Sequence, residues 1–80
     1  MERLEVVDKI SEFVKETMMG RVSDIKPDDS LAEDIGVDSM GRVELITMIE
    51  DEYGMLIEDD DVSSMITVND VVDYVLKHVE

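Results

Sequence analysis

The sequence predicts an all-α fold, namely a four-helix bundle with a short third helix and a long loop between the first and second helices. Apolar residues recur three and four positions apart over three long segments, which is the period of amphipathic helices. Turn-forming residues concentrate between residues 21 and 38. The consecutive acids at residues 58–61 favour the start of a further, shorter helix, because acids are stabilised at the positive end of the helix dipole.

The first helix is expected from residue 4 to about residue 19. Charged side chains occupy one face of this segment. The opposite, apolar stripe consists of Leu4, Val7, Ile10, Val14 and Met18. Gly20 is expected to follow the helix as its C′ residue, since glycine adopts left-handed backbone angles without steric cost.

The segment from residue 21 to residue 38 is expected to be a loop, because Pro27, Gly36 and the cluster at residues 28–30 are turn signals. A connection of about 18 residues is long for so small a domain. It nevertheless contains dispersed apolar residues, which are Val22, Ile25, Leu31, Ile35 and Val37. We therefore expect this loop to be held against the core.

The apolar period resumes in a second helix from Met40 to Tyr53, and Gly54 ends it. The short third helix is expected from about Asp59 to Met65.

The last segment has the clearest helical pattern, with apolar residues at positions 68, 71, 72, 75, 76 and 79. Thr67 and Asp70 have the spacing of a capping box with Asp in place of Glu, which places the start of this helix at Val68.

The chain is strongly acidic, with 22 Asp and Glu against 7 Lys and Arg and a formal net charge of -15 at pH 7. This charge argues against direct binding to a nucleic-acid backbone or to an anionic membrane. Residues 43–76 contain ten acids and neither Lys nor Arg. Such a stretch is either a well-solvated surface or a field that steers basic partners, and composition alone leaves both open.

A length of 80 residues fits one small domain, and no apolar run approaches the roughly 20 residues of a membrane-spanning helix. The first five residues do not resemble a signal or transit peptide. The absence of cysteine excludes disulfides and thiol nucleophiles and fits a reducing compartment. We expect a cytoplasmic monomer that forms a single domain over residues 1–80.

The sequence does not predict an enzyme. Its only histidine, His78, lies near the C-terminus, where we expect a surface cation that stabilises the negative end of a helix rather than a catalytic residue. Carboxylates are abundant, but no two stand out as an acid and a base in separate environments. The acids at residues 58–61 lack the alternation and the central glycine of an EF-hand loop, so no dedicated metal site is expected.

One short motif, Asp38-Ser39-Met40, has a chemical rationale, because it lies where the long loop meets the second helix. In one interpretation Asp38 only caps the helix, since Asp is among the preferred N-cap residues. In the other, the hydroxyl of Ser39 carries a phosphate ester beside the positive helix end and its unpaired N–H groups. A separate enzyme would then supply the catalysis, so this chain needs no base.

The wider sequence resembles the acyl carrier proteins. The stretch from Ser30 to Met40 is similar to the family's signature of Leu, Asp, Leu or Ile, Gly and Asp-Ser-Leu, and the similarity covers nearly the whole chain. The resemblance implies that a phosphopantetheinyl transferase attaches 4′-phosphopantetheine to Ser39, with Asp38 assisting. The thiol of this arm would carry acyl groups as thioesters between enzymes of fatty-acid, polyketide or related specialised synthesis.

The resemblance also implies two sets of binding residues. Acyl-transferring and acyl-modifying enzymes with basic patches would dock on Met40, Arg42, Val43, Glu44, Thr47, Glu50, Asp51, Asp59 and Asp60. The acyl chain would lie against Ile46, Ile49, Ile57, Val62 and Met65.

Some positions depart from the family pattern. Met40 replaces the usual Leu, Gly41 removes a charge from the docking edge, and Arg42 adds a charge of opposite sign. The motif at residues 38–41 also looks like that of the D-alanyl carrier proteins, so an aminoacyl carrier is the alternative with the same chemistry. The alternative of a different class is a non-carrier acidic interaction module in which Ser39 is only structural.

Overall fold

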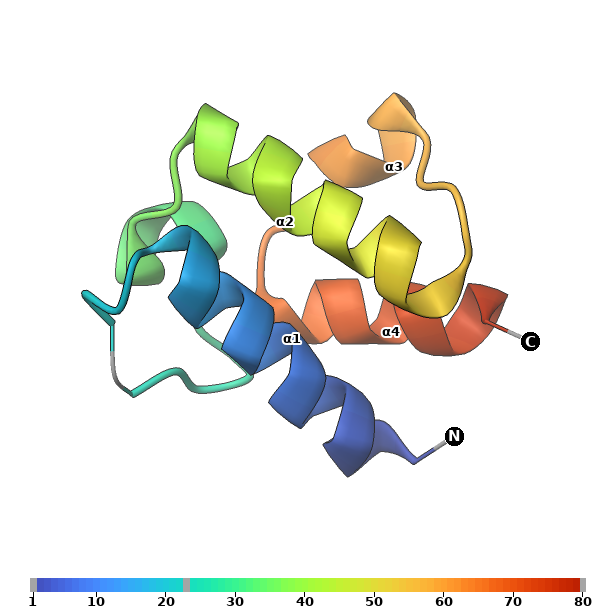
Figure 1. Ribbon diagram of the computed structural model, residues 1–80, viewed down its shortest axis with the longest axis horizontal. Helices are drawn as coiled ribbons and strands as arrows, with labels where there is room; N and C mark the ends of the chain where they lie inside the picture. Colours follow the sequence, from blue (N-terminus) through green and yellow to red (C-terminus); the bar gives the residue numbers. More distant parts are fainter. Residues whose placement is uncertain (1, 23, 80) are drawn as a thin grey trace.

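The computed structural model describes residues 2–22 and 24–79. Its elements are α1 (Arg3–Thr17), η1 (Leu31–Ile35), α2 (Ser39–Tyr53), α3 (Asp59–Ser63) and α4 (Val68–His78). α1 packs against both α4 and α2, and the short α3 lies alongside α2 (Figure 1). Because the described residues form helices and no strand, the predicted all-α bundle with a short third helix is confirmed.

The hydrophobic core lies between α1, α2 and α4 and consists of aliphatic side chains. α4 contributes four valines from one face, as the apolar spacing predicts, so helical packing outweighs the strand preference of these β-branched residues. The fully buried side chains of the core are Val6, Ile10, Val14, Leu31, Leu45, Ile49, Val68, Val71, Val72 and Val75.

The start of α4 is the predicted capping box. The hydroxyl of Thr67 accepts a hydrogen bond from the N–H of Asp70 at 3.1 Å. The carboxylate of Asp70 accepts one in return from the N–H of Thr67 at 3.0 Å, and a further one from Ile66 at 2.9 Å. The bond from the Thr67 backbone is the main cause that lowers the pKa of the Asp70 carboxyl below its usual value.

α1 ends earlier than the apolar period predicts. The helix stops at Thr17, and Met19 is the first residue with a left-handed backbone, at φ 56°. The N–H of Met19 donates to the carbonyl of Glu16 and the N–H of Gly20 to that of Lys15, both at 3.0 Å. These two bonds form a Schellman motif with Met19 at C′, so the prediction of Gly20 at C′ is wrong. α3 likewise ends before the predicted Met65, at Ser63.

The long loop contains a helical turn that the sequence analysis did not predict. The turn is η1, which is π-helical. The hydroxyl of Ser30 accepts a hydrogen bond from the N–H of Glu33 at 3.2 Å, and the carboxylate of Asp34 accepts one from the N–H of Ser30 at 2.8 Å. Gly36 ends the turn with a left-handed backbone at φ 92°. The loop through residue 38 is therefore irregular only in part.

Residues 27–31 of this connection are held against the start of α4. The N–H of Leu31 donates to the carbonyl of Ile66 at 2.9 Å, and the N–H of Asn69 donates to that of Pro27 at 2.8 Å. Leu31, Ile35 and Val37 are buried in the core. The chain therefore reaches the first residue of α2 from a fixed position.

α2 has two apolar faces, of which only one belongs to the core. Gly41, Leu45 and Ile49 face the interior. Met40 and Val43 are 74% and 66% exposed, although they share the apolar period that predicts the helix. The second face therefore remains at the surface beside Ser39.

Candidate functional site

Ser39 is exposed as the first residue of α2, and the residues before it fix its position. Asp38 is the N-cap, since its Oδ1 accepts a hydrogen bond from the N–H of Gly41 at 2.7 Å. Val37 is buried, and its N–H donates to the carbonyl of Leu31 at 2.7 Å. The predicted capping role of Asp38 is confirmed, and Ser39 is exposed at the capped start of α2.

Gly41 is buried beneath this cap. A Cβ atom at residue 41 would lie 3.2 Å from Oδ1 of Asp38 and 3.2 Å from Cγ1 of Val37, which is closer than ordinary contact. Gly41 is buried, so this residue is not itself part of the exposed docking surface. Its lack of a side chain instead lets the capping residue approach the helix closely.

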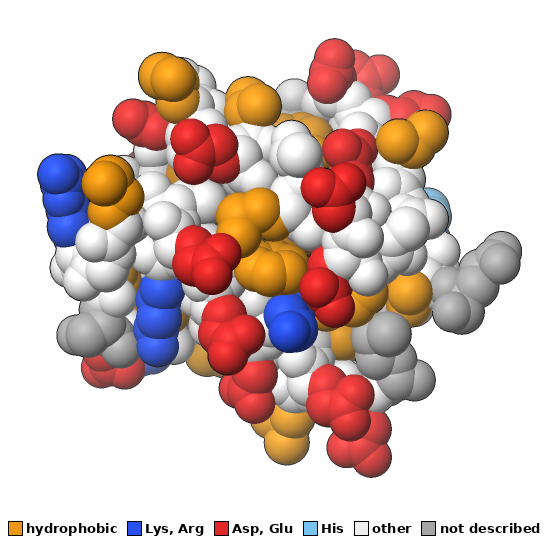
Figure 2. Space-filling view, in the orientation of Figure 1, with side chains coloured by type: hydrophobic (Ala, Val, Ile, Leu, Met, Phe, Trp, Pro, Cys, Tyr) orange, Lys and Arg blue, Asp and Glu red, His pale blue; other side chains and the backbone are white. Residues whose placement is uncertain are grey.

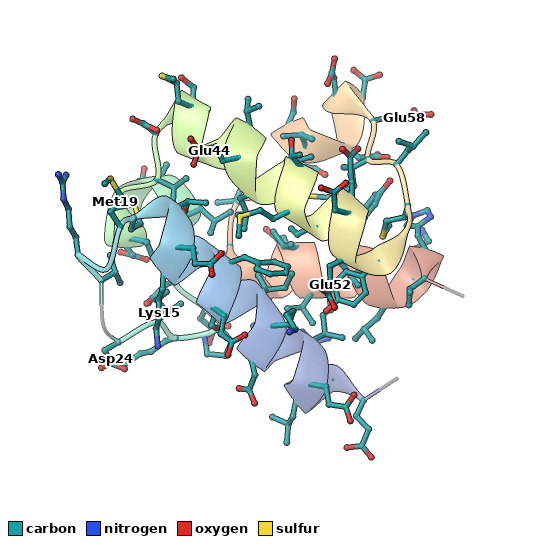
Figure 3. The ribbon with its side chains drawn as sticks, in the orientation of Figure 1. Lys15, Met19, Asp24, Glu44, Glu52 and Glu58 are labelled. Atoms are coloured by element: carbon teal, nitrogen blue, oxygen red, sulfur yellow. The ribbon has the colours of Figure 1, made fainter. Side chains whose placement is uncertain are left out.

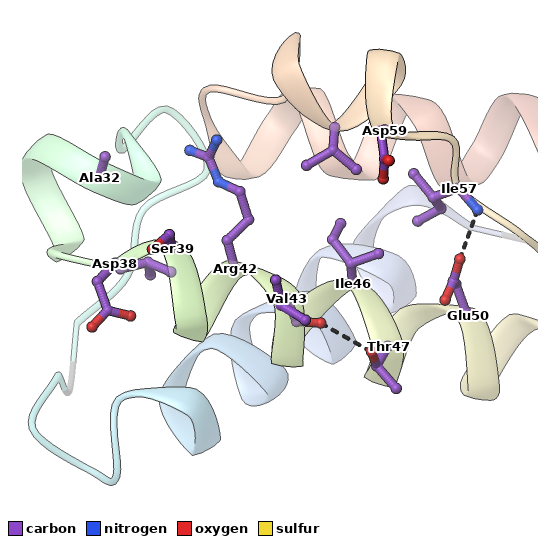
Figure 4. Close-up of a pocket in the computed structure, with 12 residues that line it drawn as sticks. Ala32, Asp38, Ser39, Arg42, Val43, Ile46, Thr47, Glu50, Ile57 and Asp59 are labelled. Carbon is purple, nitrogen blue, oxygen red and sulfur yellow. Dashed lines mark hydrogen bonds between the residues drawn. The ribbon is translucent and has the colours of Figure 1, made fainter.

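A groove of about 710 Å³ begins beside Ser39 and runs along α2 toward α3 (Figure 4). Its walls come from η1, from the two residues that precede α2, from α2 itself, from α3 and from Ile57 in the segment before α3. The lining residues are Ala32, Val37, Asp38, Ser39, Arg42, Val43, Ile46, Thr47, Glu50, Ile57, Asp59 and Val62. Aliphatic side chains form much of the lining, so the groove suits a flexible apolar chain attached at its mouth.

The predicted acyl-pocket residues divide between this groove and the core. Ile46, Ile57 and Val62 line the groove. Ile49 and Met65 are 0% and 3% exposed and do not line it. Ala32 and Val37 line it without having been predicted, because they come from η1 and the residues after it. The capping spacing from Ser30 to Glu33 was the signal in the sequence that could have found this turn.

The predicted docking residues lie in two environments. Arg42 and Glu50 are half-buried and line the groove. An oxygen of Glu50 accepts a hydrogen bond from the N–H of Ile57 at 2.8 Å, which links α2 to the segment before α3 (Figure 4). The others are exposed, and three of these also line the groove, namely Val43, Thr47 and Asp59. The exposed residues outside the groove are Met40, Glu44, Asp51 and Asp60.

The face that α1 and α2 present in Figure 2 is mostly acidic. Acidic side chains, together with a basic one, border an apolar patch between these two helices, and Figure 3 shows Glu44 and Glu52 on α2. Within the described residues two ion pairs form, Arg3 with Asp73 at 2.6 Å and Lys9 with Glu12 at 3.9 Å. Most acids of α2 and α3 therefore add to a common field rather than pairing with a cation.

His78 lies far from Ser39. It belongs to the last turn of α4, which ends at the opposite side of the molecule from the start of α2 (Figure 1). Its ring stacks on Tyr74 with the ring centroids 4.2 Å apart. The geometry therefore brings no histidine to the serine. Among the described residues, no helix is both long and apolar enough to cross a bilayer.

Comparison with known proteins identifies the family. A family model described as a phosphopantetheine attachment site matches residues 6–75. An acyl carrier protein of Desulforapulum autotrophicum is 39% identical over 75 residues, which cover 92% of this chain and 97% of that protein. One of Rubrobacter xylanophilus is 37% identical over 78 residues, which cover 98% and 96%. The crystal structure of an acyl carrier protein from Thermotoga maritima matches with a TM-score of 0.82 and 31% identity, over 96% of this chain and 89% of that one.

The helical bundle and the match to a phosphopantetheine attachment site thus define a carrier of a covalently bound group. The chain belongs to the acyl carrier proteins, and its cofactor is covalently attached 4′-phosphopantetheine. As a member of this family it carries acyl groups and interacts with a phosphopantetheinyl transferase and with acyl-handling enzymes.

Proposed function

We propose that Ser39 is the attachment site of the arm. The observation that carries this proposal is the exposure of Ser39 at the first residue of α2, directly at the mouth of the groove. In the transfer, the Ser39 oxygen forms a new bond to the phosphorus atom that carries the pantetheine in coenzyme A. The bond to the adenosine bisphosphate leaving group breaks, and the serine proton passes to the transferase. This chain supplies the nucleophile only and catalyses no reaction of its own.

Asp38 and the groove have separate parts in this function. One oxygen of Asp38 is engaged by the N–H of Gly41, and the carboxylate remains exposed, so it is available to the transferase and its divalent ion. The acyl chain lies in the groove against Ile46, Ile57 and Val62. Ile49 and Met65 would reach the chain only if the groove deepened toward the core.

The exposed acids of α2 and α3, with the apolar pair Met40 and Val43, form the docking surface for enzymes with basic patches. Complementary charge speeds the encounter, and the exposed apolar pair supplies contact area beside the serine. The chain acts as a cytoplasmic monomer of one domain over residues 1–80. Its pathway is fatty-acid, polyketide or related specialised synthesis, and the aminoacyl carrier is the alternative to be tested.

Intact mass tests the attachment site. Wild type, Ser39→Ala and the control Ser63→Ala, which alters an exposed serine in α3, are each incubated with coenzyme A and a broad-specificity transferase. Wild type and the control should gain the mass of one arm, and Ser39→Ala should gain none. An unmodified wild type, beside a known carrier that is modified, would refute the proposal. Loading with acyl and aminoacyl donors then separates the two cargo classes.

A further inference from the structure

We propose that Arg42 binds the phosphodiester that joins the arm to the protein and so acts as an anion clamp at the mouth of the groove. The inference rests on the proposed attachment of the arm at Ser39. It assigns to Arg42 a role in binding the cofactor that differs from its expected role in partner docking.

The position of Arg42 brings its guanidinium within reach of this phosphate. Arg42 follows Ser39 by three residues in α2, so the two lie on one helix face with Cβ atoms about 5–6 Å apart. Both residues line the groove, and Figure 4 shows the Arg42 side chain extending from α2 on the groove side. The phosphate is bonded to the serine oxygen, so it stays near Arg42 wherever the rest of the arm moves.

Among the described residues, Arg42 forms no ion pair, although the chain is rich in acids. It is half-buried, and it takes part in neither of the two ion pairs that the described residues form. Its aliphatic stem lies along the groove with Val43 and Ile46 nearby in the lining. A planar guanidinium binds phosphate oxygens through parallel N–H donors, and such charge-assisted bonds are stronger than neutral ones.

The acidic surroundings of Ser39 make Arg42 the side chain that offsets the negative charge of the arm. The arm adds a negative phosphodiester beside Asp38 in a chain that already has a net charge of -15. Arg42 is the only Lys or Arg between residues 27 and 76. Two other polar groups of the groove are engaged, since Thr47 donates to the carbonyl of Val43 and Glu50 accepts from a backbone N–H, and the remaining charged side chains of the lining are acids. Arg42 is therefore the group of the lining that can offset the added charge.

An acyl cargo with a terminal carboxylate offers the same anionic chemistry. The groove favours the phosphodiester, because its cation lies at the mouth beside Ser39, whereas the lining further along α2 and α3 contains the acids Glu50 and Asp59 and no Lys or Arg. A cargo at the far end of the arm would have to fold back to meet Arg42, whereas the phosphate is held there by its covalent bond.

The test compares apo and holo forms of wild type, Arg42→Gln and Lys77→Gln. Lys77 is exposed in the last turn of α4 and does not line the groove, so its variant removes the same charge far from Ser39. Loading of each holo form is confirmed by intact mass. The readouts are the phosphorus NMR resonance of the arm, the Arg42 side-chain N–H resonance and the melting temperature of each form.

In wild type, loading should shift the Arg42 side-chain resonance. The phosphorus resonance should differ between wild type and Arg42→Gln but not between wild type and Lys77→Gln. Attachment of the arm should also lower the melting temperature of Arg42→Gln further than that of wild type. The two shifts should differ by on the order of 1–8 °C. Arg42→Lys keeps the charge without the planar fork, so it should recover only part of this difference.

Equal changes in all variants on loading would overturn the clamp. A second outcome would also overturn it, namely that Arg42→Gln has no effect when the thiol of the arm is free or carries a butyryl group and has one only with a succinyl group. Arg42 would then recognise the carboxylate of the cargo rather than the phosphodiester. A wild type that gains no mass with the transferase would instead refute the proposed function, and the clamp with it.

Discussion

Removal of the helix cap at Asp38 should destabilise the protein by an amount that the structure allows us to estimate. Asp38→Ala eliminates the hydrogen bond of 2.7 Å to the N–H of Gly41 and a negative charge at the start of α2. Loss of an N-cap costs about 0.5–2 kcal/mol, typically about 1. The charge at the helix terminus contributes roughly 0.3–1 kcal/mol of this stabilisation. For a domain of this size, 1 kcal/mol corresponds to a melting temperature lower by about 4–8 °C.

Thermal unfolding followed by far-UV circular dichroism measures this effect. Asp38→Asn is the matched control, because asparagine retains a capping oxygen and loses only the charge, so it should melt closer to wild type. A melting temperature of Asp38→Ala within about 1 °C of wild type would refute the reasoning, since the cap would then contribute less than the usual range. The same pair tests the proposed role toward the transferase, because unchanged loading of Asp38→Asn would exclude a role for its charge.

Three further outcomes are expected. Asp70→Ala should cost about 1 kcal/mol at neutral pH. Because the pKa of this carboxyl is lowered, its contribution to the free energy of unfolding is fully present above the ordinary pKa of 3.8 and is lost as the pH falls through the lowered pKa. The free energies of unfolding of variant and wild type, measured in urea, should therefore converge in acid. Ile49→Ala should cost about 2–5 kcal/mol because Ile49 is fully buried, whereas exposed Val43→Ala should change unfolding by less than about 0.5 kcal/mol. Added salt should raise the melting temperature, because residues 43–76 contain ten acids and no Lys or Arg, and a flat response would show that these acids are too far apart to repel.

The helices with strong local signals could be predicted from the sequence. The last helix has an uninterrupted apolar period and a capping box, and its observed start at Val68 agrees with both. η1 was missed because its capping spacing lies between Pro27 and Gly36, whose turn signals dominate the segment. The end of α1 was misplaced because backbone hydrogen bonds put a non-glycine residue, Met19, into the left-handed conformation.

The site was predictable where it depends on local rules. An Asp before a helix is a preferred N-cap, so Asp38 and the exposed hydroxyl that follows it could be located. The lining of the groove depends on tertiary packing instead. Both faces of α2 are apolar, and spacing alone does not show that Gly41 faces the core or that Val43 faces solvent. The contribution of Val37 requires knowledge of how η1 returns to the helix.

The hydrogen bond from the N–H of Ile57 to Glu50 changes what a charge-reversal scan of α2 would measure. Glu50→Lys removes a docking charge and also leaves a backbone donor without its acceptor, at a cost of about 1–3 kcal/mol where water cannot replace it. Asp51 is exposed, so its reversal alters mainly the surface field. Charge reversal at Glu50 therefore changes both stability and partner binding, whereas reversal at the adjacent Asp51 changes mainly partner binding. Glu50→Gln, which keeps an acceptor and discards the charge, is the substitution that makes the two comparable.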